Sequence, residues 1–158
     1  MSDQKSIITQ FYTAFQNKDA DAMAALYHAD AAFEDPAFGK LNSEEVKAMW
    51  RMLIARGGKD LKIEFKLTTE NDRVAQGTWQ AFYTFSQTQR QVHNIISVKM
   101  KFKDGKITEH YDEFDFWRWS GMALGLSGKL LGWSPLIKNK VRAKSRAALD
   151  NFMAQQND

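Results

Sequence analysis

The sequence predicts a single α+β domain, in which a curved antiparallel sheet wraps around helices that precede it in the chain. Apolar residues recur at helical spacing between positions 6 and 57, whereas residues 61–117 alternate between apolar and polar as strands do. With 158 residues, 44% of them hydrophobic and 13% aromatic, the chain can bury one sizeable core. A sheet curved around helices leaves a conical cavity, which suits a small apolar ligand.

Two helices are expected at the start of the chain. Apolar residues of the first recur every three or four positions, at Ile7, Ile8, Phe11, Tyr12 and Phe15. Asp19 is placed to cap the second helix, because its carboxylate can accept from a free backbone N–H of the first turn. Met23, Leu26 and Tyr27 of that helix are expected to face inward.

A short strand and a third helix follow. The strand is expected around residues 32–34, and Pro36 and Gly39 stop it. Asn42 and Glu45 have the spacing of a capping box, which predicts the start of the third helix. Two consecutive glycines at positions 57 and 58 predict its end.

Four longer strands and a helical extension complete the chain. The strands are expected within residues 61–68, 73–86, 92–102 and 106–117. A glycine-punctuated segment follows, in which Pro135 starts or interrupts a helix. We therefore expect a domain of residues 1–118 and a C-terminal helical extension, residues 119–158, packed on the same domain.

Composition excludes several classes of protein. The chain has no cysteine, so disulfides, thiolate metal sites and thiol nucleophiles are excluded. The first residues lack the basic start and apolar run of a signal peptide, and no apolar run approaches about 18 residues. These features predict a soluble, cytoplasmic protein.

The tail is basic: residues 117–158 hold seven basic against two acidic residues. We expect a solvated helix face and no nucleic-acid binding, because no nucleic-acid motif accompanies these charges. Large apolar residues lie close to the basic ones, at Leu124, Leu126, Leu130, Leu131 and Trp133. They could contact a membrane surface. The interpretation that we favour is a lid over the mouth of the cavity.

The last expected strand carries a dense group of ionisable and aromatic residues, ITEHYDEFDFWRW at positions 107–119. Strand alternation divides its charged residues between two faces. One face holds Thr108, His110, Asp112, Phe114 and Phe116, and the other holds Ile107, Glu109, Tyr111, Glu113 and Asp115. The register of the preceding hairpin decides which of the two faces lines the cavity.

Two turns are compatible with the hairpin. A two-residue turn centred on Asp104 and Gly105 sets Met100 opposite Glu109, whereas a type I turn with Gly105 in a left-handed bulge sets it opposite Thr108. The apolar residues of the preceding strand must face the core, and only the bulged register gives their face His110, Asp112 and Phe114. We therefore prefer the bulge, which also pairs Lys99 with Glu109.

Two aspartates are candidates for acid–base chemistry. Asp112 would be poorly solvated in the cavity, and burial raises a carboxyl pKa toward neutrality. His110 on the same face could tune or orient it; a buried carboxylate satisfied by an amide or a tyrosine hydroxyl is the structural alternative. Asp35 stands before a proline, where an aspartate is commonly a turn former.

The segments FYTAFQNKDADAMAALYHADAAFEDP, AFGKLNSEEVKAMW and DGKITEHYDEFDFWRW together resemble the nuclear transport factor 2-like superfamily, in its SnoaL-like and ketosteroid-isomerase-like branch. The resemblance covers about residues 5–117, and the Trp-rich tail resembles that of bacterial SnoaL-like proteins. It implies a cystatin-like conical barrel with an open apolar mouth, usually a homodimer.

The resemblance also implies roles for both aspartates. Asp35 falls where ketosteroid isomerase carries its general base, but Phe11 and Val98 occupy the positions of its oxyanion hole, which argues against steroid isomerisation. Asp112 looks like the acid/base aspartate of SnoaL-type polyketide cyclases, which need no metal or organic cofactor.

Our leading hypothesis is therefore an isomerase-, cyclase- or hydratase-like enzyme that transfers protons on a small apolar substrate without a cofactor. Asp112 is the preferred acid/base, Asp35 the second candidate, and His110 tunes or orients. The candidate ligand-binding residues are Asn94, Phe15, Phe38, Trp50 and Phe114. The alternative is a non-catalytic module of the same fold that binds a small ligand or another protein.

Overall fold

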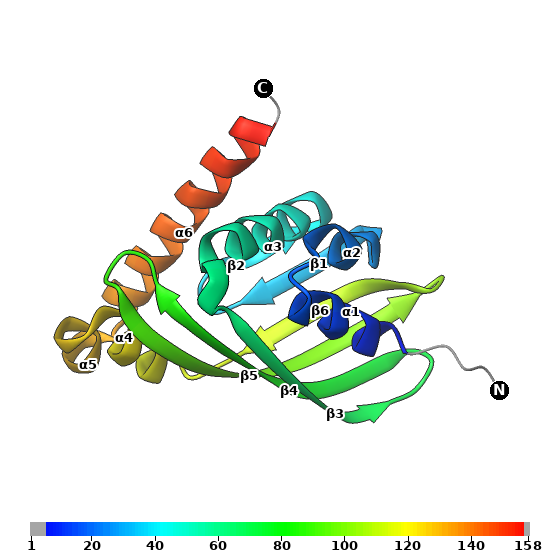
Figure 1. The fold of residues 1–158 in the computed structure, drawn as a ribbon, viewed down its shortest axis with the longest axis horizontal. Helices are drawn as coiled ribbons and strands as arrows, with labels where there is room; N and C mark the ends of the chain where they lie inside the picture. The colour runs from blue at the N-terminus through cyan, green and yellow to red at the C-terminus, as the bar shows by residue number, and fades with distance from the viewer. Residues whose placement is uncertain (1–5, 157–158) are drawn as a thin grey trace.

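The computed structural model describes residues 6–156. Its elements are α1 (Ile7–Gln16), α2 (Ala20–Ala25), β1 (Tyr27–Asp35), β2 (Gly39–Asn42), α3 (Ser43–Gly57), η1 (Gly58–Asp60), β3 (Lys62–Glu70), β4 (Val74–Phe85), β5 (Arg90–Lys103), β6 (Lys106–Glu113), α4 (Phe116–Leu124), α5 (Leu126–Leu131) and α6 (Pro135–Gln156). The predicted α+β class is confirmed. Helices α1 to α3 cover one face of a curved sheet, and α4 to α6 gather at one end of it (Figure 1).

One sheet contains all six strands, in the order β2-β1-β6-β5-β4-β3. Neighbouring strands are antiparallel except β1 and β6, which pair in parallel. The C-terminal ends of β1 and β6 therefore lie at the same end of the sheet. Asp35 is the last residue of β1 and Asp112 the last but one of β6, so this topology brings the two aspartates to one region.

The first strand is longer than predicted. It runs from Tyr27 to Asp35 instead of covering only residues 32–34, and a second strand, β2, follows the turn that contains Pro36. Tyr27 was expected on the second helix and instead begins β1. The segment is rich in alanine and aspartate, which have weak strand propensity, but β1 has hydrogen-bonded neighbours on both sides, β2 and β6.

The predicted helix starts are confirmed. The Asp19 carboxylate accepts from the Ala22 backbone N–H at 3.1 Å. The Asn42 side chain accepts from the Glu45 backbone N–H, and the Glu45 side chain accepts from the Asn42 N–H, both at 2.9 Å. Pro135 begins α6, where its missing N–H leaves no hydrogen bond unmade.

The last strand ends earlier than expected, at Glu113. Asp115 caps α4 by accepting from the Arg118 backbone N–H at 3.0 Å, and Phe116 is the first residue of that helix. Both residues were expected on the strand. The expected boundary between domain and extension, at residues 118 and 119, consequently falls inside α4.

Helix α6 packs against the domain that precedes it. Its Leu149 is fully buried in the main core, together with Phe11, Phe33 and Trp50. Arg146 of α6 also makes a 2.7 Å ion pair with Glu45 at the start of α3.

Candidate functional site

A cavity of about 470 Å³ lies between the sheet and the helices. Its wall is mainly apolar and aromatic, and it contains both candidate aspartates. The predicted ligand-binding residues all line it: Asn94, Phe15, Phe38, Trp50 and Phe114. Their assignment to a ligand remains a prediction.

The β5–β6 hairpin closes with a two-residue turn. Asp104 and Gly105 both have positive φ, 55° and 72°, as a type I′ turn requires. The turn pairs Phe102 with Ile107. The predicted bulge at Gly105 is therefore wrong: the Asp-Gly pair forms the tight turn that this dipeptide favours.

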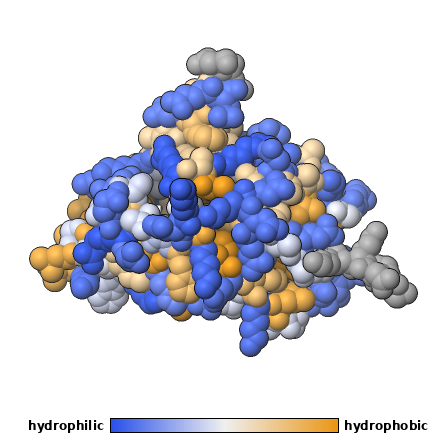
Figure 2. All heavy atoms as spheres, in the orientation of Figure 1, coloured by the Kyte–Doolittle hydropathy of each residue, from blue (hydrophilic) through white to orange (hydrophobic). Residues whose placement is uncertain are grey.

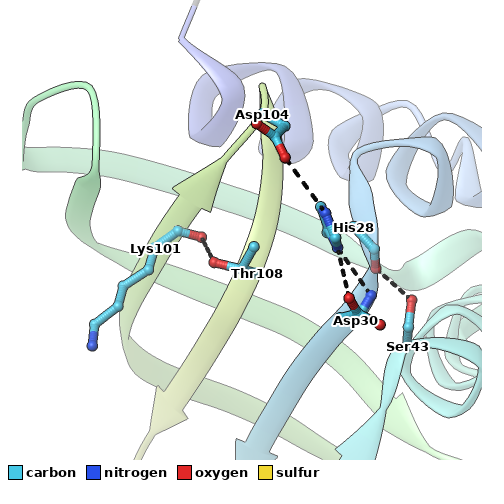
Figure 3. Close-up of polar contacts among 6 residues, drawn as sticks. All are labelled: His28, Asp30, Ser43, Lys101, Asp104 and Thr108. Carbon is cyan, nitrogen blue, oxygen red and sulfur yellow. Dashed lines mark hydrogen bonds and ion pairs between the residues drawn. The ribbon is translucent and has the colours of Figure 1, made fainter.

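The bulge lies instead inside β6, at Thr108. The pairing register shifts there, and beyond it Met100 stands opposite His110. The Thr108 hydroxyl donates to the carbonyl oxygen of Lys101 at 3.2 Å across the hairpin (Figure 3). The extra residue shifts the alternation of side chains by one position. His110 and Asp112 therefore point inward and are buried as expected, although in a different register.

The remaining carboxylates of β6 belong to the outer face. Glu109 pairs with Lys101 at 3.3 Å instead of with Lys99, and Glu113 is exposed. The predicted division holds from Glu109 to Glu113. Ile107, which was expected on the outer face, is instead fully buried, because the bulge at Thr108 reverses the alternation of side chains.

Asp112 is the end of a buried hydrogen-bond network. Trp50 Nε1 donates to the Tyr27 hydroxyl at 2.8 Å, and that hydroxyl lies 2.7 Å from His110 Nδ1. His110 Nε2 lies 3.0 Å from Asp112 Oδ1, to which Trp79 Nε1 also donates at 3.3 Å. The side chains of His110 and Asp112 are 0% and 3% exposed. Trp50 and Trp79 thus bracket the network from both sides.

One tautomer of neutral His110 satisfies the whole network. An ionised Asp112 only accepts, so His110 Nε2 carries a proton and a neutral imidazole accepts at Nδ1. The Tyr27 hydroxyl can supply the proton of that hydrogen bond, because burial raises the Tyr27 pKa well above its usual value. Both of these hydrogen bonds to Asp112 go to Oδ1, and the Asp112 side chain lines the cavity. His110 does not line the cavity, so it cannot contact a ligand there. Its hydrogen bond instead suits it to orienting Asp112.

Asp35 reaches the cavity from the end of β1. Its Oδ1 accepts from the Phe38 backbone N–H at 2.6 Å, so it does form the turn expected before a proline. The pKa of Asp35 is raised from 3.8 to about 7: burial is the largest cause, the hydrogen bond from the Phe38 N–H opposes it, and the Asp112 charge adds to the rise. Asp35 can therefore exist in both protonation states near neutral pH.

Replacing Asp35 with Asn should make stability less sensitive to pH. A raised folded-state pKa means that the wild-type protein loses stability as pH rises from about 4 to about 7, because the unfolded chain gives up this proton first. Asn keeps the oxygen that accepts from Phe38 but has no proton to lose. Relative to wild type, the free energy of unfolding of the variant should rise by roughly 1–4 kcal/mol across this pH range. Above about pH 7 the difference should stay constant.

Urea unfolding at several pH values measures this difference. Glu34→Gln is the matched control, since Glu34 is the exposed neighbour on the same strand. A constant difference between Asp35→Asn and wild type from pH 4 to 8 would show that Asp35 has an ordinary pKa.

Several residues of the site were not predicted. Tyr27 and Trp79 complete the polar network, and Arg56, Lys140 and Lys144 add positive charge to the cavity wall. The sequence pattern did not single out Trp79. Its contact with Asp112 depends on the registers of β4, β5 and β6 together, which no local pattern reveals.

The predicted lid is only partly correct. Leu124 lines the cavity, and so do Ile137, Val141 and Ala148 of α6. The other large apolar residues of the tail instead point to solvent: Leu126, Leu130, Leu131 and Trp133. They cannot act as a lid, because α5 presents its glycine side to the protein.

Residues 6–156 offer neither a cluster of metal-ligating side chains nor a membrane-spanning helix. No group of three or more His, Asp and Glu side chains there could hold a metal ion. No helix in that range is long and apolar enough to cross a membrane.

Comparison with known families identifies the domain. The family model of the SnoaL-like domain matches residues 8–110, which is more than half of the chain. The chain belongs to the SnoaL-like family. The match to the SnoaL-like domain ends just before Asp112, so that aspartate lies at its edge. No curated protein matches the chain.

Solved structures with this SnoaL-like fold share little sequence with the chain. A LEH-like epoxide hydrolase of M. tuberculosis is 18% identical, with a TM-score of 0.57 over 78% of this chain and 92% of its own. A ketosteroid isomerase-like protein from Catenulispora acidiphila, in complex with trimethylamine, is 16% identical, with a TM-score of 0.64 over 82% and 97%. IdmH from Streptomyces antibioticus, a proposed polyketide cyclase, is 20% identical, with a TM-score of 0.61 over 76% and 96%. At these identities the similarity establishes the fold alone.

Proposed function

We propose that this protein binds a small apolar molecule in its cavity and catalyses cofactor-free proton transfer on it, as an isomerase, cyclase or hydratase does. One observation carries the proposal: two carboxyl groups line the same apolar cavity, and the pKa of one of them is about 7. A group with a pKa near the working pH can give up a proton and take it back within one reaction.

The two aspartates have different roles in this proposal. Asp112 is the base: His110 and Trp79 hold Oδ1, and Oδ2 removes a proton from a carbon next to a carbonyl. Protonated Asp35 donates to the carbonyl oxygen as charge develops there. Asp112 then returns its proton to carbon, and the enol hydroxyl returns its proton to Asp35. Both groups are thereby restored. Asn94, buried in the same wall, is a neutral donor for the carbonyl oxygen.

The named relatives support chemistry on organic molecules in this fold. Their names include a LEH-like epoxide hydrolase and a proposed polyketide cyclase. The same cavity would equally serve a binding protein that performs no reaction. The test must therefore separate binding from proton transfer.

Proton exchange of simple ketones in deuterium oxide makes that separation. Cyclohexanone and β-tetralone are suitable probes, because exchange of their α-protons requires only an acid and a base. We expect NMR to detect enzyme-dependent exchange whose rate falls as pH rises through about 7, where Asp35 loses its proton. A rise in the protein's Tm when either ketone is added, without any exchange of its α-protons, would favour the non-catalytic alternative.

A further inference from the structure

We propose that the outer surface of the helical extension docks onto a lipid bilayer that contains anionic lipids. The surface, here called the apolar face, consists of six exposed side chains: Trp117, Leu126, Leu130, Leu131, Trp133 and Leu136. Their exposed fractions range from 46% for Leu131 to 72% for Leu136. Large apolar groups concentrated in this way on a surface mark an interaction site. This proposal does not depend on the catalytic one.

The packing of α5 against α4 explains why these leucines point outward. A Cβ at Gly128 would lie 1.9 Å from the Ser120 carbonyl oxygen, and one at Gly132 would lie 2.7 Å from the Ser120 Cβ. Only glycine fits at both positions. The segment therefore contacts the protein through its smallest residues and turns Leu126 and Leu130 toward solvent.

Two tryptophans extend the apolar face along α5. Trp117 Nε1 donates to the Lys129 carbonyl oxygen and Trp133 Nε1 to the Leu130 carbonyl oxygen, both at 2.9 Å. The indole N–H groups are satisfied, and 52% and 63% of these residues' surfaces remain exposed. Figure 2 shows hydrophobic residues at the end of the molecule where α5 lies in Figure 1. Tryptophan side chains are enriched where proteins meet the membrane interface.

The charges around the apolar face identify the partner. Arg118, Lys129 and Lys138 are close to it in the sequence, and residues 116–149 contain no aspartate or glutamate. A second copy of this chain on the same face would bring like charges together. Anionic lipid headgroups complement these charges, and the bilayer interior accepts the leucine and tryptophan side chains.

Vesicle sedimentation tests the proposal with the full chain. The probes are phosphatidylcholine vesicles with and without roughly 30% phosphatidylglycerol, at about 0.1 M salt. We expect binding to the anionic vesicles at least about tenfold tighter than to the neutral ones, weakened at about 1 M salt. A blue shift of tryptophan emission should accompany binding, since Trp117 and Trp133 are exposed.

The triple variant Leu126→Ser, Leu130→Ser and Trp133→Ser should bind anionic vesicles at least about tenfold more weakly than wild type. All three side chains are exposed, so circular dichroism should stay unchanged. Ile95→Ser is the matched control, because Ile95 is 45% exposed on a different surface, in β5.

Three results would overturn the proposal. They are failure of the folded wild-type protein to bind anionic vesicles, equal binding to neutral vesicles, and unchanged binding of the triple variant. A dimer or a complex with an acidic protein that the triple variant abolishes, without vesicle binding, would assign the apolar face to protein contact instead.

Discussion

Asp112→Asn is expected to lower the rate of ketone proton exchange by about 10²–10⁴-fold, the usual contribution of a positioned general base. The amide keeps an oxygen that can accept from His110 Nε2 and Trp79 Nε1. It cannot take a proton from the substrate. The loss should therefore appear in kcat, while KM for the ketone changes little.

Glu113→Gln is the matched control for this variant. Glu113 is the next residue of β6, but it is exposed on the opposite face of the strand. Its replacement should leave the exchange rate within about a factor of two of wild type, since surface substitutions perturb a structure little. Full exchange activity in folded Asp112→Asn would remove Asp112 from the reaction.

Asp35→Asn distinguishes the two carboxyls in the same assay. It should slow exchange below pH 7, where wild-type Asp35 is protonated, and the fall in rate above pH 7 should disappear, because the acid that titrates there is absent. Identical pH profiles for wild type and Asp35→Asn would assign the titration to another group.

The face of β6 illustrates what the sequence could and could not determine. The apolar alternation of β5 correctly required His110 and Asp112 to point inward. The Asp-Gly dipeptide is typical of a tight two-residue turn, which the structure has at Asp104 and Gly105 although we preferred the bulge. These two requirements conflict unless one extra residue enters the strand, and the structure places it at Thr108. A bulge has no strong local signature, so combining both constraints was the only route to it from the sequence.

In the C-terminal extension, the sequence predicts the helices but not which side of them faces the protein. Its helices and the start at Pro135 follow from local patterns. Which side of α5 faces the protein does not, because the usual rule that leucines pack inward fails here. Contacts between Ser120 and the two glycines Gly128 and Gly132 decide it, and these depend on how α5 folds back on α4.

The buried network predicts the largest loss of stability. His110→Leu should lower the free energy of unfolding by roughly 2–5 kcal/mol, because it leaves Asp112 without its histidine donor and the Tyr27 hydroxyl without an acceptor. Leucine fills much of the volume, so lost packing against Phe11 and Phe33 should contribute less. Urea unfolding at neutral pH measures the change.

A second substitution separates the electrostatic cost from the packing cost. A buried charge that has lost its partner destabilises a protein more than an apolar pair does. If Asp112 without His110 causes most of the loss, adding Asp112→Leu to His110→Leu should therefore recover part of the free energy of unfolding. Further loss in the double variant would mean that His110 stabilises the fold by packing alone. Tyr27→Phe probes the orienting role: it removes the hydroxyl that lies next to His110 Nδ1 and accepts from Trp50 Nε1. The protein should stay folded, while kcat for exchange falls and KM changes little.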